Sequence, residues 1–147
     1  MKSEDTQYND TIFVTNDWRD NDIYFWVKYS NDKSGDTYFS GYLESGQRTS
    51  GTLKVSPYKG VHDLWTISIL NSAGHLWSTN YKQSCGLPDK SISNIELLLN
   101  ATDQKAEFHF PDGSDPKSIE MDWFGSGDEM PYDPSAGSRK LDLASAE

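Results

Sequence analysis

The chain has few of the features that would tie it to a particular chemistry or compartment. It has a single cysteine, Cys85, so neither an internal disulfide nor a zinc site of several thiolates can form. The longest apolar runs, such as residues 23–27 and 97–99, are far too short to cross a bilayer. Residues 1–6 contain no apolar stretch, so we expect no signal peptide. The localisation stays open between the cytoplasm and export by another route.

Signatures of known reactions are also missing. The sequence contains no G-x-S-x-G motif, no P-loop and no dinucleotide-binding glycine pattern. His62, His75 and His109 fall on separate predicted elements without ligand spacing, so we predict no zinc site. Glu107 and Glu120 alternate outward on two predicted strands, which suits a solvated face better than a glycosidase pair. An enzyme is therefore the least favoured class.

Positive charge is scarce, because 13 lysines and arginines stand against 23 aspartates and glutamates, for a net charge of -10. Such a field repels phosphate backbones and anionic lipid surfaces, so we expect no nucleic-acid partner. Aromatic residues are abundant instead: they make up 13% of the 147 residues and include five tryptophans. A chain of this length forms one domain with room for a core of large rings.

Period-two alternation dominates the chain, and no sustained apolar run has helical spacing. We therefore predict an all-β fold, an antiparallel β-sandwich of about eight or nine strands over residues 1–124, with a partly open barrel as the alternative. Residues 94–100 fit either a strand or the start of a helix. Small, polar and proline residues prevail over residues 125–147, which we predict to form an extended tail. The predicted strands are residues 11–15, 23–29, 37–44, 52–56, 64–70, 75–81, 92–100, 106–110 and 117–124, with the first two forming a hairpin.

The most informative segment, residues 64–81, is predicted to form two strands around a turn at residues 71–74. If Leu70 pairs with His75, one face is apolar core and the opposite face mixes rings with hydroxyls. Rings on a rigid strand can stack on a sugar or lie at the level of a lipid head group, while hydroxyls orient the ligand. The plainer interpretation, in which Trp77 and Tyr81 are packed under a loop, is favoured by about two to one because large aromatics are mostly buried. In this register the core face holds Trp65, Ile67, Ile69 and Leu76, and the mixed face holds Leu64, Thr66, Ser68, Leu70, His75, Trp77, Thr79 and Tyr81.

A second strand extends the mixed surface. Residues 23–29 alternate so that Tyr24 and Trp26 point away from the core face, and Tyr38 and Tyr42 follow on the next strand. If both faces of this strand are covered, Trp26 belongs to a second small core instead. An error of one residue in register would exchange the two faces. The predicted ligand-binding residues are Trp77, Tyr81, His75, Trp26 and Tyr24, whose rings would stack on the ligand while His75 bonds a ligand oxygen.

Acidic residues gather in several loops, which makes calcium worth considering. Asp17, Asp20 and Asp22 share one predicted turn, and Asp112 and Asp115 share another, but no loop has the EF-hand spacing. Asp and Asn are also ordinary turn formers, because their side chains bond the backbone two residues on. We favour turn chemistry over calcium by roughly four to one and predict no cofactor.

Two functions from different classes follow. The first is a non-enzymatic binding module whose aromatic sheet face recognises a glycan or a lipid head group. In layout alone the chain resembles the small, acidic, Trp-rich lectins and the lipid-binding cytolysins such as aegerolysins, which implies a lectin-like or membrane-targeting role. The second is an acidic inhibitor, immunity-type or assembly protein that docks a basic protein partner through its net charge. The aromatic excess is the more unusual feature, so we rank ring-mediated binding first; an oligomer is compatible with both.

Overall fold

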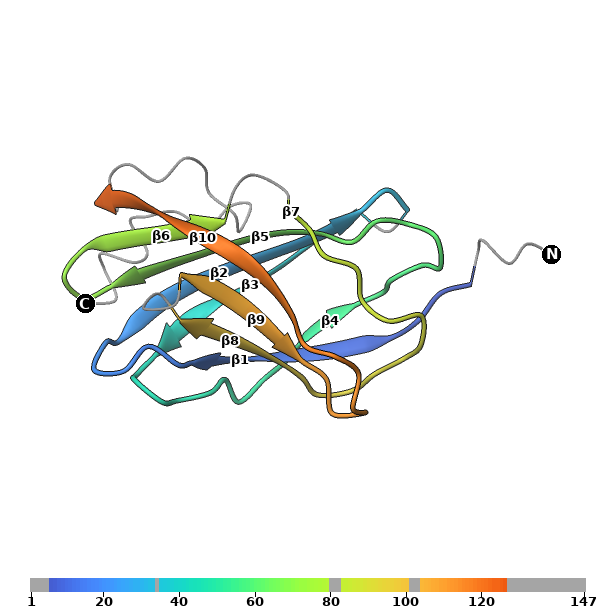
Figure 1. Ribbon diagram of the computed structural model, residues 1–147, viewed down its shortest axis with the longest axis horizontal. Helices are drawn as coiled ribbons and strands as arrows, with labels where there is room; N and C mark the ends of the chain where they lie inside the picture. Colours follow the sequence, from blue (N-terminus) through green and yellow to red (C-terminus); the bar gives the residue numbers. More distant parts are fainter. Residues whose placement is uncertain (1–5, 34, 80–82, 101–103, 127–147) are drawn as a thin grey trace.

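The computed structural model describes residues 6–33, 35–79, 83–100 and 104–126 of the chain. These residues form ten β-strands and no helix (Figure 1). The all-β prediction is confirmed, and residues 95–100 lie in a strand rather than a helix. The strands are β1 (Asp10–Asn16), β2 (Ile23–Asn31), β3 (Gly35–Leu43), β4 (Leu53–Val55), β5 (Leu64–Asn71), β6 (His75–Thr79), β7 (Gln83–Ser84), β8 (Ile95–Asn100), β9 (Lys105–His109) and β10 (Lys117–Ser126).

The strands follow one sheet path that is nearly closed and barrel-shaped. Its order is β3-β2-β5-β6-β10-β9-β8-β1-β4, and the short β7 adds to β5. β10 joins the two halves because its first residues pair with β9 and its later residues with β6 (Figure 1). The choice between a sandwich and a partly open barrel stays a prediction. Among the described strands every pairing is antiparallel except that of β1 with β8, so the expected antiparallel sheet has one parallel exception.

The predicted hairpin of the first two strands is wrong. β1 pairs with β4 and β8, whereas β2 pairs with β3 and β5. The connection between them crosses from one half of the sheet to the other instead of turning back. Buried Asn16 holds this crossing, because its side-chain amide donates to the carbonyl oxygens of Asn21 at 2.6 Å and Leu43 at 3.2 Å. The short polar sequence predicted a turn, but β1 takes β4 and β8 as its neighbours and β2 takes β3 and β5.

One apolar core fills the inside of the sheet, and the two halves meet in it through aromatic rings. The indole of Trp65 on β5 lies 4.8 Å from the Tyr29 ring on β2 and 4.7 Å from the Phe108 ring on β9, measured between ring centroids. Trp65 is fully buried and its indole N–H donates to the carbonyl oxygen of Cys85 at 2.9 Å. The alternation predicted for residues 23–29 is confirmed, since Ile23, Phe25, Val27 and Tyr29 are all buried in this core.

The predicted register of residues 64–81 is off by one. Leu70 pairs with Leu76 rather than with His75, and Ile69 pairs with Trp77. The side chain of Asn71 causes the shift, because its Oδ1 accepts the backbone N–H groups of Ala73 at 3.1 Å and His75 at 2.8 Å. These bonds lengthen the turn by one residue. Because β-strand side chains alternate, Trp77 moves to the core face and Leu76 to the opposite face.

The strand ends differ slightly from the prediction. β10 continues past residue 124 to Ser126, and residues 127–147 lie outside the described residues, so the extended tail stays a prediction. β7 has no counterpart among the predicted strands. In the part of the chain that the structure describes, no helix is long and apolar enough to span a membrane.

Candidate functional site

The structure does not bring the five predicted ligand-binding residues onto one surface. Tyr24 is half-buried and Trp26 is only 4% exposed, and neither side chain belongs to the main core. Trp77 is half-buried and packs against that core from β6. His75 is exposed beside the β5–β6 turn, and Tyr81 lies outside the described residues. Tyr24 and Trp26 therefore share the outer face of β2, while Trp77 faces inward.

Cross-strand pairing arranges the outer face of β3, β2, β5 and β6 in rows. Within the second row Trp26, Ser68 and Ser78 are buried, and the two serine hydroxyls bond each other at 2.8 Å. Trp26 is therefore covered on the outer face of β2, whereas Tyr24 and Leu70 in the neighbouring row are half-buried; a second small core around Trp26 stays a prediction. At β3 the same face is exposed. The first row is Tyr42, Tyr24, Leu70 and Leu76, and the second row is Ser40, Trp26, Ser68 and Ser78.

Tyr42 on β3 is the one large hydrophobic side chain among the described residues that is strongly exposed, at 48%. Its ring is tilted by 53° against that of Tyr24, with 4.9 Å between the centroids. Partial desolvation raises the pKa of the Tyr42 phenol, and the neighbouring carboxylate of Asp22 raises it further. The phenol is therefore neutral near pH 7, and its ring can stack on a ligand. We call Tyr24 and Tyr42 the tyrosine platform.

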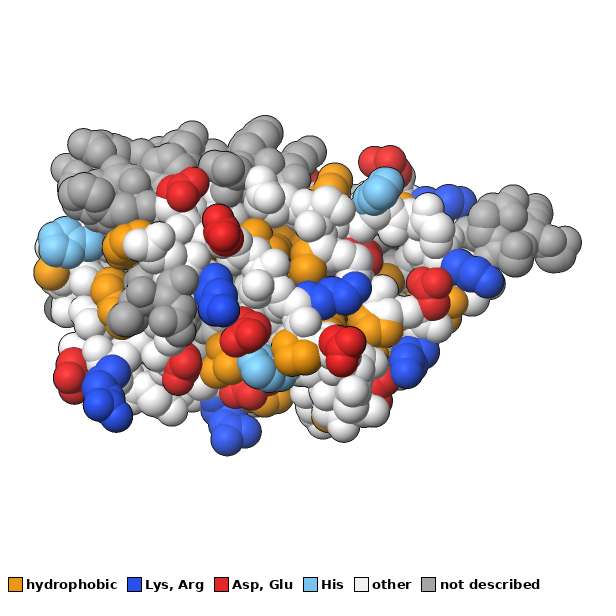
Figure 2. All heavy atoms as spheres, in the orientation of Figure 1, with side chains coloured by type: hydrophobic (Ala, Val, Ile, Leu, Met, Phe, Trp, Pro, Cys, Tyr) orange, Lys and Arg blue, Asp and Glu red, His pale blue; other side chains and the backbone are white. Residues whose placement is uncertain are grey.

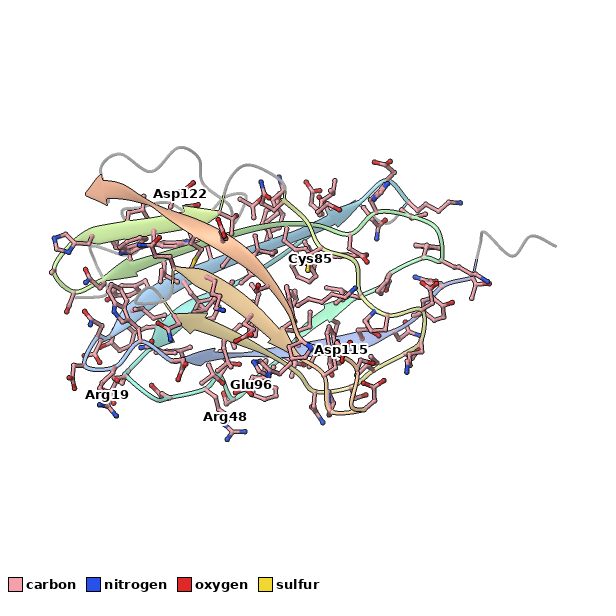
Figure 3. The ribbon with its side chains drawn as sticks, in the orientation of Figure 1. Arg19, Arg48, Cys85, Glu96, Asp115 and Asp122 are labelled. Carbon is pink, nitrogen blue, oxygen red and sulfur yellow. The ribbon has the colours of Figure 1, made fainter. Side chains whose placement is uncertain are left out.

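A cleft of about 300 Å³ opens beside Tyr42. It lies at the seam of the nearly closed sheet, where β3 ends the sheet path and residues 47–51 lead toward β4. Phe25 and Phe39 line it with rings that meet edge-on at 5.5 Å between centroids. Its polar lining includes Ser40, Gln47, Arg48, Thr49 and Ser50, of which Arg48 extends away from the barrel (Figure 3). We call this hollow the seam cleft; it combines apolar ring surface with hydrogen-bonding groups.

No protein-family model matches the chain, and neither does any curated protein. Among the described residues on the face over β9 and β10, acidic and basic side chains are interspersed and hydrophobic atoms form small separate groups (Figure 2). The seam cleft and the tyrosine platform remain the best candidate for a ligand.

A second cleft, of about 280 Å³, lies at one end of the barrel between residues 57–63 and residues 84–89. Asp63 lines it although this residue is only 4% exposed. Its Oδ1 accepts a hydrogen bond from the Tyr29 hydroxyl and its Oδ2 accepts one from the backbone N–H of Leu87 at 2.9 Å. Burial raises the pKa of Asp63, while these two hydrogen bonds oppose the rise. We call this hollow the end cleft.

In the acidic loops, the Asp and Asn side chains mostly accept hydrogen bonds from backbone N–H groups of their own turns. Asp112 Oδ1 accepts the N–H of Ser114 at 2.9 Å, and Asn31 Oδ1 accepts the N–H of Lys33 at 2.8 Å, each two residues on. Asp22 Oδ1 instead ties its loop to Ser45, whose N–H lies 3.1 Å away. Within the described ranges, no group of three or more His, Cys, Asp or Glu side chains is arranged to hold a metal ion.

Sequence reasoning missed several residues of these sites. Tyr42 was predicted only as an extension of the surface, and Arg48 carried no signal because it lies in a loop. Asp10 and Asp63 look like ordinary polar residues flanking strands, yet they are 1% and 4% exposed. The only hint in the sequence was that each Asp directly precedes a predicted strand. This position does not reveal that the two side chains are buried, because chain segments distant in sequence cover them.

Proposed function

We propose that this protein is a non-enzymatic binding module that recognises a neutral glycan at the tyrosine platform and the seam cleft. The observation that carries the proposal is the exposed ring of Tyr42, which contacts Tyr24 and belongs to a residue that also lines a cleft with hydroxyl, amide and guanidinium groups. An aromatic ring can stack on the apolar face of a sugar, and such polar groups can bond its hydroxyls.

The distribution of exposed apolar groups favours a glycan over a membrane surface. A protein face that enters a lipid interface needs a broad apolar area, commonly built from several large side chains. Tyr42 is the one such side chain that is strongly exposed in the described ranges. The net charge of -10 also opposes binding to anionic lipids. A sugar ring, in contrast, requires only one or two aromatic faces.

The lining of the seam cleft also favours binding over catalysis. Among the described residues that line it, none is an Asp, Glu, His or Cys. These types supply most general acids, general bases and thiol nucleophiles. Of the five residues predicted from the sequence, the proposal keeps Tyr24 at the centre, and His75 stays a predicted contact. Trp26 is too buried to stack on a ligand without moving, and Trp77 packs against the core from the inner face of β6.

The test is retention of the full chain on a panel of immobilised neutral oligosaccharides, measured alongside sedimentation with phosphatidylcholine vesicles. We expect retention on at least one oligosaccharide and none on the vesicles. Tyr42→Ala should weaken retention about tenfold, because loss of an aromatic stacking partner and its desolvated contact costs about 1.4 kcal/mol. Far-UV circular dichroism should not change, because the ring is half exposed.

Tyr58→Ala is the matched control. Tyr58 is a half-buried tyrosine that lines the end cleft rather than the seam cleft, so this variant should keep the retention of the wild type. Failure of the wild type to bind any oligosaccharide, or equal retention by Tyr42→Ala, would overturn the proposal. Binding to vesicles without binding to oligosaccharides would replace the glycan with a lipid head group.

A further inference from the structure

Residues 85–92 connect β7 to β8 and run across one end of the barrel, at the right of Figure 1. We call this segment the strap. Two buried aspartates hold it near its two ends. Asp63 accepts the N–H of Leu87 at 2.9 Å, and Asp10 accepts the N–H of Ile92 through Oδ1 at 2.8 Å. Both carboxylates thus join the barrel wall to the backbone of the strap.

The second oxygens of the two carboxylates have different surroundings. Asp63 Oδ1 accepts a hydrogen bond from the Tyr29 hydroxyl, whose oxygen in turn accepts one from the side-chain amide of Asn31 at 2.8 Å. Asp10 is 1% exposed, and its Oδ2 is buried without a hydrogen-bond partner in the described part of the chain. An ionised oxygen in such a place is costly, because no donor replaces the water that it loses. The charge on Asp63 adds repulsion to that cost.

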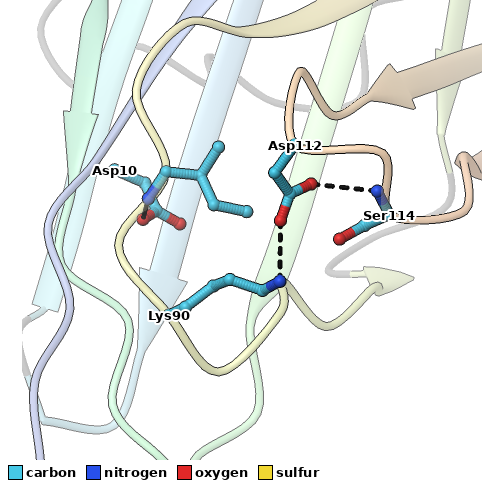
Figure 4. Close-up of polar contacts among 5 residues, drawn as sticks. Asp10, Lys90, Asp112 and Ser114 are labelled. Atoms are coloured by element: carbon cyan, nitrogen blue, oxygen red, sulfur yellow. Dashed lines mark hydrogen bonds and ion pairs between the residues drawn. The ribbon is translucent and has the colours of Figure 1, made fainter.

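The positively charged side chains near the strap interact with groups other than Asp10. The ammonium of Lys117 stabilises the charge of Asp63 and donates to the carbonyl oxygen of Gly86 at 2.7 Å. The ammonium of Lys90, on the strap itself, pairs with Asp112 at 2.7 Å (Figure 4). The N–H of Ile92 therefore donates the hydrogen bond that stabilises the charged form of Asp10. Burial outweighs this bond and raises the pKa of Asp10 from 3.8 to about 6.

Other titratable groups border this region. Asp89 on the strap raises the pKa of Asp63 further. His62 is exposed and lines the end cleft. His109 on β9 lies 3.2 Å from the Glu107 carboxylate. Cys85 is buried, and burial raises the pKa of its thiol. None of these groups supplies a positive charge fixed beside Asp10.

The strap also forms one wall of the end cleft. Ser84, Gly86, Leu87 and Asp89 line the cleft from this side, and residues 57–63 line it from the other. A strap that lifts from the barrel would therefore widen this cleft and expose Asp63.

We propose that Asp10 and Asp63 form a proton-sensitive clasp on the strap, which holds residues 85–92 down when Asp10 is protonated and lets them lift, opening the end cleft, when Asp10 ionises. Besides the two carboxylate bonds, lifting the strap breaks the bond from the N–H of Thr11 to the carbonyl oxygen of Ile92, and it exposes the buried side chains of Leu87 and Ile92. It is independent of glycan binding at the seam cleft.

The test is native-state amide hydrogen exchange of the full chain, corrected for the intrinsic pH dependence of exchange. Linkage between a carboxyl pKa of 3.8 in the open state and about 6 in the closed state predicts that protection of Leu87 and Ile92 falls about tenfold from pH 5 to pH 7.5 and then levels off. Because the opening exposes only the strap and the groups beneath it, exchange at these two amides should depend on urea less steeply than global unfolding does.

Asp10→Asn should remove the pH dependence, since the amide oxygen still accepts the N–H of Ile92 but carries no charge. Asp112→Asn is the matched control: it breaks the ion pair to Lys90, yet the pKa of Asp112 is lowered to about 2 by that pair, so it does not titrate in this range. This variant should keep the tenfold change. His62→Gln and His109→Gln should keep it as well.

Three results would overturn the clasp. They are equal protection at the two pH values in the wild type, persistence of the tenfold change in Asp10→Asn, and a urea dependence at Ile92 equal to that of global unfolding. If Asp10→Asn does not fold, the ¹³C chemical shift of the Asp10 carboxyl in the wild type decides instead. A titration midpoint near 6 supports the clasp, and a midpoint near 4 overturns it.

Discussion

Replacing Trp65 by phenylalanine tests the central contact between the two halves of the sheet. Trp65 is fully buried on β5, and its indole contacts Tyr29 on β2 and Phe108 on β9. The indole N–H also donates to the carbonyl oxygen of Cys85 at 2.9 Å, which ties the strap to the core. Trp65→Phe keeps an aromatic ring in place but removes this donor and part of the ring volume.

The magnitude follows from these two losses. A buried carbonyl that loses its donor costs about 1–3 kcal/mol. The smaller ring leaves a space that the surrounding core fills only in part, which adds roughly 1–2 kcal/mol. We therefore expect the free energy of unfolding to fall by about 2–5 kcal/mol. For a chain of this size that is a fall in melting temperature of roughly 6–15 °C.

Urea denaturation followed by far-UV circular dichroism gives the free energy of unfolding directly. Trp77→Phe is the control, because Trp77 packs against the same core but is only half-buried, so its replacement should cost no more than about 1 kcal/mol. A loss below about 1 kcal/mol for Trp65→Phe, or a loss equal to that of the control, would refute the argument that Trp65 links the two halves.

Two further predictions concern protonation and tryptophan exposure. The pKa of Asp10 is raised in the folded state from 3.8 to about 6, so its contribution to stability is complete below the unfolded pKa and is lost as the pH rises through about 6. Asp10→Asn should therefore raise the free energy of unfolding at pH 7.5 by up to about 3 kcal/mol, measured by urea denaturation, and a variant less stable than the wild type there would contradict this sign. In acrylamide quenching, Trp18→Phe should lower the accessible fraction of tryptophan emission because Trp18 is only half-buried, whereas Trp26→Phe should raise it because Trp26 is 4% exposed and its loss removes shielded emission; equal effects would contradict the assigned burial.

The alternation of side chains within single strands was predictable from the sequence. Ile23, Phe25 and Val27 face the core as the period-two pattern requires, because the direction of a side chain along a strand depends only on neighbouring residues. Most core residues could therefore be predicted from the sequence. The candidate site could be predicted only in part: Tyr24 was among the predicted ligand-binding residues, Tyr42 was predicted only to extend their surface, and the seam cleft was not predicted.

The register of β5 and β6 shows how a local detail misplaces a site. One side chain, Asn71, bonds two backbone N–H groups in the turn and shifts the pairing by one residue. That shift moved Trp77 from the expected ligand surface to the core face. A turn formed by Asn and Gly is visible in a sequence, but its length depends on which backbone groups the side chain reaches.

The sequence by itself determined a β-rich domain with a core of large rings, because hydrophobic periodicity is a local property that each strand carries alone. Only the tertiary structure decided which strands are neighbours, since β1 lies between β4 and β8 rather than beside β2. It also decided that Asp10 and Asp63 are buried together beneath the strap. Burial of a charge depends on chain segments that are distant in sequence and meet only in the folded sheet.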